Sequence, residues 1–294
     1  MPTPIHDTSK PVLVTGATGF LAGWIVKDLL DLGYTVHAAV RDPNNAVKTG
    51  HLQKLADASS GTLKLFKADL LNDGSYDEAM QGCGTVFHTA SPFTSDFKDA
   101  QTQLVDPAVN GTRNVLNAAN KTESVRRVVL TSSCAAIYGD AIDTTNAPKG
   151  HLTEEVWNTS SSLTHVPYSY SKTLAEKAAW DMAEAQSRWK LVVINPALIT
   201  GPSLGAAPTS EVFAIIKQLT DGAAKSGVPH LELGAVDVRD VSTAHLNAAF
   251  IEDAHGRNIV FNKQMTFLEI GQAIAAKWPD LPTPKRVMPK WLVC

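Results

Sequence analysis

Residues 11–23 read PVLVTGATGFLAG, and this stretch decides the fold. An apolar run typical of a buried strand leads into a glycine-rich turn, and a second apolar segment follows. This order places backbone N–H groups and the positive end of a helix where a pyrophosphate can bind. Gly16 permits the tight turn, and Gly19 lets the backbone approach the phosphates. Ala22 or Gly23 allows close helix–strand packing, so the stretch predicts the dinucleotide-binding turn of a βαβ unit.

The rest of the chain alternates short apolar runs with longer amphipathic segments, which predicts an α/β fold. Near-continuous Val, Leu and Ile runs indicate strands buried on both faces, hence a doubly wound parallel (Rossmann) sheet with a smaller C-terminal substrate lobe. We expect residues 1–195 to form the dinucleotide-binding Rossmann domain, with 232–262 contributing, and 196–231 and 263–294 to form the substrate-binding lobe. The expected strands are 11–15, 35–40, 62–67, 85–89, 127–132, 190–195, 231–233 and 258–261. The expected helices lie near 20–32, 45–58, 75–81, 100–120, 168–187, 210–221 and 266–277, the last with Thr266 and Glu269 in a capping box.

Composition limits the classes of function. The chain has 294 residues, a net charge of −3 and no block of like charges. This charge distribution does not favour binding to nucleic acids or to membrane surfaces. No segment approaches the ~18 apolar residues of a membrane span, and the N-terminus lacks the apolar stretch of a signal peptide. Cys83, Cys134 and Cys294 show no CxxC spacing, and the nine His residues show no HxxxH or HExxH spacing, so we expect neither disulfides nor a metal. Cys134 could act as a nucleophile, but a small apolar residue at the end of a strand is the expected role. These features favour a cytoplasmic enzyme.

The second expected strand ends in Val40-Arg41-Asp42-Pro43, where a Rossmann enzyme binds the adenosine ribose. A cation here accommodates the 2′-phosphate of NADP(H), and Arg41 presents a planar fork for it, with Lys48 as a second charge. Asp42 leaves an alternative open, because an acidic residue at this position accepts a hydrogen bond from the 2′-hydroxyl of NAD(H). We expect NADP(H) as the cofactor.

Short loops after the other expected strands complete the cofactor site. Asp69 and Leu70 follow the third strand, and an Asp there can meet the adenine amino group. Thr89, Ala90 and Ser91 follow the fourth strand, where small side chains let the cofactor lie along the strand ends. The residues expected to bind the cofactor are Thr15, Gly16, Thr18, Gly19, Phe20, Leu21, Arg41, Lys48, Asp69, Leu70, Thr89, Ala90, Ser91, Thr131, Tyr168, Lys172, Pro196 and Leu198.

Tyr168 and Lys172 lie four residues apart at the start of an expected helix, and therefore on one helix face. Hydride transfer to a carbonyl leaves an alkoxide that needs a proton, which a tyrosine can supply when a nearby ammonium stabilises its phenolate. Ser133, at the end of the fifth expected strand, can donate a hydrogen bond to the substrate oxygen. Ser132 is a competing choice for this serine, and Tyr170 is excluded because it has no lysine four residues later. The three residues Ser133, Tyr168 and Lys172 predict a nicotinamide-dependent oxidoreductase.

These residues resemble the extended short-chain dehydrogenases/reductases. The most similar branch contains dihydroflavonol reductases, cinnamoyl-CoA reductases and microbial aldehyde and carbonyl reductases. The shared motifs follow the family order over roughly residues 11 to 270. They are VTGATGF at 14–20, VRDP at 40–43, FHTASP at 87–92, DPAVNGT at 106–112, LTSS at 130–133, TEEVW at 153–157, YSYSK at 168–172, NPA at 195–197 with GP at 201–202, and VRDV at 238–241.

The resemblance implies Ser133, Tyr168 and Lys172 as the catalytic residues and NADPH as the reductant. It also implies that residues 134–165 and 197–230 build the substrate pocket. The expected function is therefore the NADPH-dependent reduction of aldehydes or ketones, with a small carbonyl compound as the substrate. The residues expected to line this pocket are Ala135, Ile137, Tyr138, Trp157, Leu198 and Phe213. Each of them could equally pack in the hydrophobic core instead.

The chain departs from the family pattern at two places. Ala22 stands where many extended members carry a third glycine. The chain also stops some tens of residues before most members do, so that it is either short or truncated. The alanine at position 22 is common in this branch. The early end of the chain affects the prediction of the substrate rather than that of the cofactor.

Two alternatives to a reductase stay open. A sugar-nucleotide epimerase or dehydratase of the same superfamily retains NAD and grips a nucleotide diphosphate with basic residues, but residues 197–235 contain only Lys217 and Lys225. A non-catalytic dinucleotide sensor often lacks the Tyr168 and Lys172 pair that this chain carries. Members of the family occur as monomers and dimers, so we expect a monomer or a homodimer.

Overall fold

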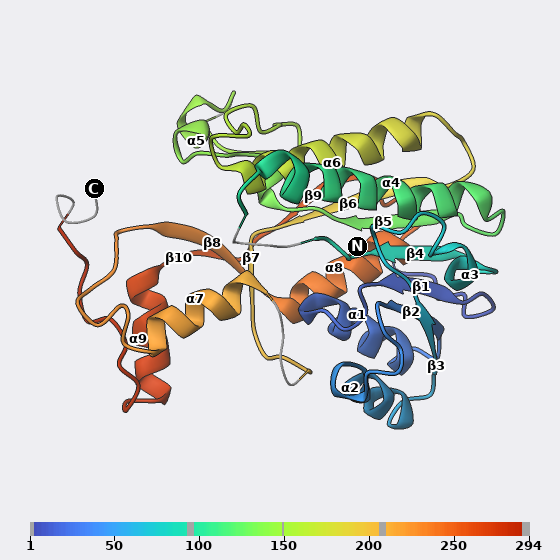
Figure 1. Ribbon diagram of the computed structural model, residues 1–294, viewed down its shortest axis with the longest axis horizontal. Coiled ribbons are helices and arrows are strands. Elements are labelled where there is room, and N and C mark those ends of the chain that lie inside the picture. The colour runs from blue at the N-terminus through green and yellow to red at the C-terminus, as the bar shows by residue number, and fades with distance from the viewer. Residues whose placement is uncertain (1–2, 93–96, 149, 206–209, 290–294) are drawn as a thin grey trace.

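The fold is built on a seven-stranded sheet in which every strand runs parallel to its neighbours (Figure 1). The computed structural model describes residues 3–92, 97–148, 150–205 and 210–289. The sheet order is β3-β2-β1-β4-β5-β6-β9, so the predicted doubly wound α/β class is confirmed. The strands of the chain are β1 (Val12–Thr15), β2 (Thr35–Val40), β3 (Thr62–Lys67), β4 (Thr85–His88), β5 (Arg127–Thr131), β6 (Lys190–Pro196), β7 (Leu198–Thr200), β8 (Glu232–Asp237), β9 (Gly256–Val260) and β10 (Lys263–Thr266).

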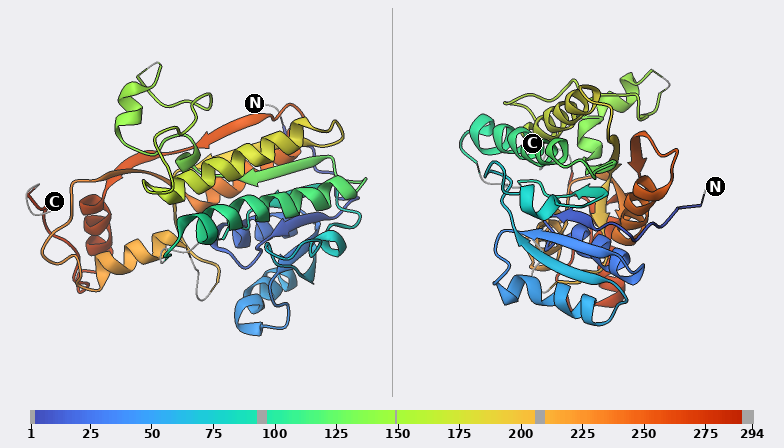
Figure 2. Two further views of the ribbon diagram at one scale, coloured as in Figure 1. Left: turned by 45° about the horizontal axis from the view of Figure 1, so that its top comes forward. Right: turned by 90° about the vertical axis from the view of Figure 1, so that its right-hand side faces the viewer.

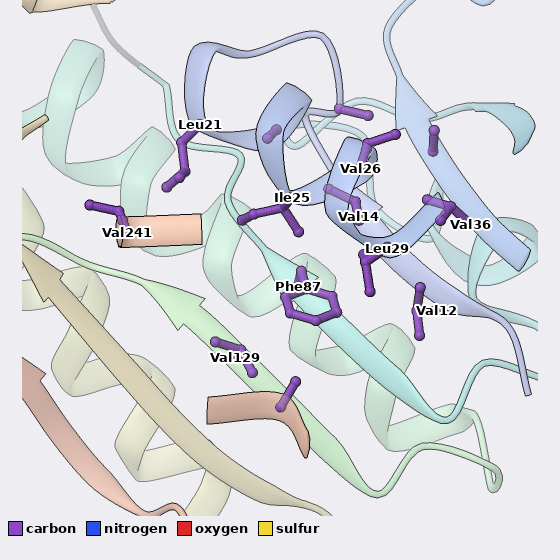
Figure 3. Packing of buried hydrophobic residues seen from close by; sticks show 14 of the residues in the cluster. Val12, Val14, Leu21, Ile25, Val26, Leu29, Val36, Phe87, Val129 and Val241 are labelled. Atoms are coloured by element: carbon purple, nitrogen blue, oxygen red, sulfur yellow. The ribbon is translucent and has the colours of Figure 1, made fainter. Parts of the chain in front are cut away.

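Alternate residues of the strands fill two hydrophobic cores, one on each face of the large sheet. Val12 and Val14 of β1 belong to the first core, whereas Leu13 between them belongs to the second. In the first core, Ile25 and Phe87 lie on the same side of the sheet (Figure 3). Burial on both faces explains why the strands read as continuous apolar runs rather than as alternating patterns.

Helices cover both faces of the sheet. Helices α1 and α8 pack together on the first core, and α4 and α6 pack together on the second (Figure 2). The helices are α1 (Phe20–Asp31), α2 (Ala46–Asp57), α3 (Asp77–Met80), α4 (Asp106–Lys121), α5 (Ile142–Asn146), α6 (Pro167–Glu184), α7 (Glu211–Thr220), α8 (Val238–Phe250) and α9 (Phe267–Lys277). A π-helical turn at Gln101–Val105 precedes α4, and a 3-10 turn at Cys134–Ala136 follows β5.

Helix α8 is absent from the expectations drawn from the sequence. Its buried residues Val238, Val241 and His245 recur at helical spacing. Asp237 caps the helix, because its carboxylate accepts a hydrogen bond from the backbone N–H of Arg239 at 2.9 Å. The apolar run of β8 continues directly into α8, and a short apolar run does not by itself distinguish a strand from a buried helix.

A smaller lobe contains a second sheet of order β10-β8-β7 together with α7 and α9 (left in Figure 1). Leu219 of α7 and Ile270 of α9 share a small core. Thr266 and Glu269 form the predicted capping box at the start of α9, where the Glu269 N–H lies 3.1 Å from the Thr266 hydroxyl. Within 232–262, α8 and β9 lie with the large sheet and β8 lies in the small one, while the division into two lobes stays a prediction.

No helix in the described part of the chain is long and apolar enough to cross a membrane. The same residues hold no group of three or more His, Cys, Asp or Glu side chains placed to bind a metal ion. Cys294, residue 149 and residues 206–209 of the predicted pocket segments lie outside the described residues.

Candidate active site

The predicted site residues meet at one edge of the large sheet. Gly16 follows β1, Ser91 follows β4, Ser133 follows β5 and Pro196 ends β6. The carboxyl ends of parallel strands share one edge, and the strand order reverses between β1 and β4. Doubly wound sheets bind their ligands at this kind of switch point.

The turn between β1 and α1 is shaped for a ligand that approaches the backbone closely. Gly16 has a φ of 62°, in the left-handed region that favours glycine. A Cβ on Gly16 would lie 3.0 Å from the Cβ of Ala90, and a Cβ on Gly19 would lie 3.1 Å from the Gly16 carbonyl oxygen. The Gly19 N–H closes the turn on that oxygen at 2.8 Å, and α1 begins at Phe20. The turn therefore fits a dinucleotide, whose pyrophosphate would meet the backbone N–H groups and the start of α1.

A buried Thr15–His88 pair connects the end of β1 to the end of β4 by hydrogen bonds next to this turn. The Thr15 hydroxyl accepts hydrogen bonds from the backbone N–H groups of Thr89 at 3.1 Å and Ala90 at 3.0 Å. Its own proton is therefore directed to Nδ1 of His88, 3.0 Å away. Burial, together with the smaller effect of the Lys172 charge, lowers the pKa of His88 to about 3, so the ring stays neutral. His88 was not predicted as a site residue, although a histidine inside an apolar strand is a signal that it has a buried partner.

Arg41 and Lys48 lie exposed beyond the end of β2, as expected for residues that meet a 2′-phosphate. Lys48 is in the first turn of α2, which Asn45 caps by accepting a hydrogen bond from the Lys48 N–H at 3.2 Å. Asp42 uses Oδ1 to accept from the backbone N–H of Asn44 at 3.0 Å, which closes its own turn. This geometry favours the cation over the carboxylate as the residue that selects the cofactor.

Asn114 holds the loop that carries Asp69 and Leu70. Its amide nitrogen donates to the carbonyl oxygens of Leu70 at 3.0 Å and Asn72 at 2.9 Å, and its amide oxygen accepts from the Gly74 N–H at 3.0 Å. Asn114 is only 3% exposed on α4. Asn114 was not predicted from the sequence, because the sequence does not indicate which distant loop a buried polar residue of a helix will hold.

The other predicted cofactor residues have different surroundings. Thr18 lies in the turn itself. Phe20 and Leu21 are buried in the core, so their backbone rather than their side chains can face a cofactor. Thr131 ends β5, and its hydroxyl is hydrogen-bonded to a histidine of α8 at 2.7 Å. Leu198 begins β7, half-buried beside the sheet edge.

Tyr168 and Lys172 lie in the first turns of α6. Lys172 Nζ is 5.7 Å from the centre of the Tyr168 ring and donates to the Ser91 hydroxyl at 2.9 Å. Helix α6 begins at Pro167 directly after Val166, whose φ of 47° is left-handed. For a β-branched residue this conformation is strained by about 1–3 kcal/mol, and such strain concentrates at functional sites. The ammonium is thus held between the tyrosine ring and the segment that follows β4.

The two neighbouring serines have different surroundings. Ser133 is half-buried, and its hydroxyl accepts from the Ala135 N–H at 3.1 Å, which leaves the hydroxyl proton for donation. Ser132 is 7% exposed, and its hydroxyl donates to Glu176 at 2.5 Å, inside the protein. Cys134 donates its thiol to the Asn195 carbonyl oxygen at 3.3 Å, and burial raises the pKa of this thiol to about 12. The geometry favours Ser133 over Ser132, and Cys134 is placed as a packing residue rather than as a nucleophile.

Residues 12–262 match the NAD dependent epimerase/dehydratase family. The chain belongs to this family. It is 42% identical to cinnamoyl-CoA reductase CAD2 of Medicago truncatula, over 94% of this chain and 83% of that protein. It is 41% identical to tetraketide alpha-pyrone reductase 1 of Arabidopsis thaliana, again over 94% and 83%. The structure of Gre2 from Candida albicans in complex with NADPH superposes with a TM-score of 0.81 at 33% identity, over 96% of this chain and 87% of that chain. These likenesses confirm the predicted membership of the reductase branch.

Several residues predicted for the pocket of this family member pack within the fold. Ile137 is 1% exposed. The Trp157 ring is covered by the guanidinium of Arg257 at 3.8 Å. Phe213 of α7 packs edge-on against Phe20 at 5.0 Å, which brings the smaller lobe against the start of α1. The geometry therefore favours the packing alternative for these three aromatic and aliphatic residues.

Proposed function

We propose that this chain reduces aldehydes or ketones to alcohols with NADPH, and that Ser133, Tyr168 and Lys172 carry the reaction. The observation that carries the proposal is the position of Lys172, whose ammonium lies 5.7 Å from the Tyr168 ring and 2.9 Å from the Ser91 hydroxyl at the switch point of the sheet. The relatives support reductase activity, since two of them are named as reductases, and the Gre2 complex supports NADPH as the cofactor.

Each side chain has a distinct task in the reaction. NADPH, when bound, supplies the hydride to the carbonyl carbon. The Ser133 hydroxyl, which accepts from the Ala135 N–H, directs its proton to the carbonyl oxygen and orients it. The Tyr168 hydroxyl delivers the proton that the resulting alkoxide needs. The Lys172 ammonium stabilises the phenolate that this transfer leaves on Tyr168.

NADP(H) rather than NAD(H) is supported by the residues after β2. Arg41 is exposed directly after the strand end, and Lys48 lies in the first turn of α2. Asp42 is engaged in its own turn through Asn44. Both cations would contact the 2′-phosphate, which NADH lacks.

Purified protein tests the function in an assay that follows loss of the absorbance of reduced cofactor. Aryl ketones, aliphatic aldehydes and β-ketoesters are offered with NADPH and NADH in parallel, and we expect turnover with NADPH preferred. Tyr168→Phe should abolish turnover and retain NADPH binding, while Tyr170→Phe on the same helix serves as the matched control. Turnover that survives in Tyr168→Phe would refute the catalytic assignment. Tight NADPH binding without turnover of any substrate would favour the epimerase or sensor alternatives.

The remaining expectations extend this proposal. A cytoplasmic location is supported by cysteines that lack paired spacing. Residues 196–231 and 263–294 would form the substrate lobe, with the contact between Phe213 and Phe20 linking it to the cofactor turn. A monomer or a homodimer is expected, and size-exclusion chromatography with light scattering distinguishes the two.

A further inference from the structure

Glu176 is a buried carboxylate one helical turn after Lys172. The residue is 1% exposed, and a carboxylate at such a position is costly unless it is paired and hydrogen-bonded. Each of its two oxygens has two donor groups around it. The donors are the Ser132 hydroxyl at 2.5 Å, the Asn195 amide at 2.8 Å, the Arg257 guanidinium at 2.6 Å and the Trp180 indole N–H at 3.4 Å.

Two of these donors connect Glu176 to the catalytic serine. Ser132 is the residue before Ser133, and its hydroxyl is fixed on Oε2 of Glu176. Asn195, at the end of β6, donates to the same oxygen at 2.8 Å and also to the Ser133 carbonyl oxygen at 3.1 Å. The backbone of Ser133 is therefore tied to Glu176 from both sides.

Arg257 holds the other side of the serine. Its side chain is 7% exposed and pairs with Glu176 through Nε, which leaves the two terminal nitrogens for backbone carbonyls. Nη2 donates to Ala136 at 3.2 Å, and Nη1 donates to Glu154 at 2.9 Å and to Val156 at 2.5 Å. Ala136 ends the 3-10 turn whose second residue donates its N–H to the Ser133 hydroxyl. The guanidinium thus anchors the turn that orients this hydroxyl.

The same carboxylate shares a helix with the other two catalytic residues. Tyr168, Lys172 and Glu176 follow one another at intervals of four along α6, and so occupy one side of the helix. Lys172, Ser132 and Glu176 line one small cavity of about 20 Å³ between α4, α6 and the ends of β4 and β5. A rigid link from Glu176 to Ser133 therefore fixes the serine relative to the tyrosine and the lysine.

We propose that the Glu176–Arg257 pair is a positioning device that sets the Ser133 hydroxyl opposite Tyr168, a proposal that rests on the reductase function above. Neither residue needs to touch the substrate. Their effect is on geometry, and a displacement of about 1 Å at a reacting group can cost about 10²-fold in rate.

Two variants and a matched control test this role. Glu176→Gln keeps the size of the side chain but places an amide donor among four donors, so Ser132 or Arg257 loses its acceptor. Arg257→Lys keeps the charge but loses the planar fork that reaches three carbonyls. Glu184→Gln changes an exposed glutamate on the same helix and is the matched control. We expect kcat to fall about 10- to 100-fold in the first two variants, with the Kd for NADPH changed less than about twofold, and no change in the control.

A double-substitution cycle separates positioning from general loss of stability. If Glu176 acts through Ser133, Glu176→Gln should lower the single-turnover rate constant in the unsubstituted protein but not in a Ser133→Ala background. An equal loss in both backgrounds would overturn the inference, as would wild-type kcat in Glu176→Gln. If Glu176→Gln does not fold, Ser132→Ala removes one bond to the carboxylate and is measured in the same cycle, with the same two results deciding. No turnover in the unsubstituted protein would refute the reductase function, and the inference with it.

Discussion

Replacing Gly16 with alanine tests the cofactor turn most directly. At a φ of 62° an alanine costs about 1–2 kcal/mol relative to an ordinary conformation. The added methyl group would also lie 3.0 Å from the Cβ and 3.1 Å from the Cα of Ala90, which is closer than van der Waals contact. Overpacking of this kind costs about 1–3 kcal/mol. We therefore expect Gly16→Ala to lower the free energy of unfolding by about 2–5 kcal/mol, or about 2–4 °C in Tm for each kcal/mol.

Cofactor binding should fall as well. To relieve the contact with Ala90, the turn must move by a few tenths of an ångström, and its N–H groups then lie away from the phosphates. A loss of about 1.4 kcal/mol in binding raises the Kd tenfold, so we expect the Kd for NADPH to rise at least about tenfold.

Two other glycines provide matched controls. Gly82 has a φ of 73° with no atom within 4 Å of an added Cβ, so Gly82→Ala carries the backbone strain without the contact. Gly50 lies in α2 with the same open space and no positive φ, so Gly50→Ala should stabilise the helix by about 1 kcal/mol. Both variants should bind NADPH normally.

Thermal unfolding followed by circular dichroism and NADPH titration calorimetry give the two readouts. Gly16→Ala should lose more stability than Gly82→Ala, and it alone should lose affinity. Equal NADPH affinity in these two variants would refute the assignment of this turn to the pyrophosphate.

Three further predictions follow from charge and burial. Arg41→Ala should raise the Kd for NADPH about 10- to 100-fold in titration calorimetry and leave the Kd for NADH unchanged, because a hydrogen bond to a charged group contributes about 1.5–3 kcal/mol. Lys48→Ala should act in the same direction. An equal loss of affinity for both cofactors would contradict the contact of these cations with the 2′-phosphate. Burial lowers the pKa of His245 to about 4 in the folded protein, whereas the same residue has a pKa of about 6.5 in the unfolded chain. Between these two values the unfolded chain binds more protons than the folded protein. The free energy of unfolding should therefore fall as the pH drops from about 6.5 to 4. His245→Asn should flatten that slope in urea titrations, and an unchanged slope would contradict it. Burial raises the pKa of the Cys83 and Cys134 thiols to about 12, so iodoacetamide at pH 8 should modify these two residues only after unfolding. Peptide mass spectrometry reads the modification at each site, and rapid labelling of Cys83 or Cys134 in the native protein would contradict this.

The features that the sequence predicted correctly depend on interactions between residues close in the chain. The strand, turn and helix of residues 11–23 follow from local periodicity and from glycines whose backbone freedom is intrinsic. The capping box of Thr266 and Glu269 spans three residues, and the pairing of Tyr168 with Lys172 spans four. Such contacts are set by the geometry of one helix turn, so the sequence alone determines them.

Contacts between distant segments were decided by the tertiary structure. Arg257 reaches Glu176 across 81 positions of the chain, and the Thr15–His88 pair spans 73. Hydrophobic periodicity indicates which side of an element is buried, but it does not indicate which polar group will meet it there. Helix α8 was missed for a related reason, because an apolar run without its tertiary neighbours is compatible with either secondary structure. The sequence therefore determined the fold class and the local parts of the site, whereas the packing of β5, β6, β9 and α6 decided which buried groups hold Ser133 in place.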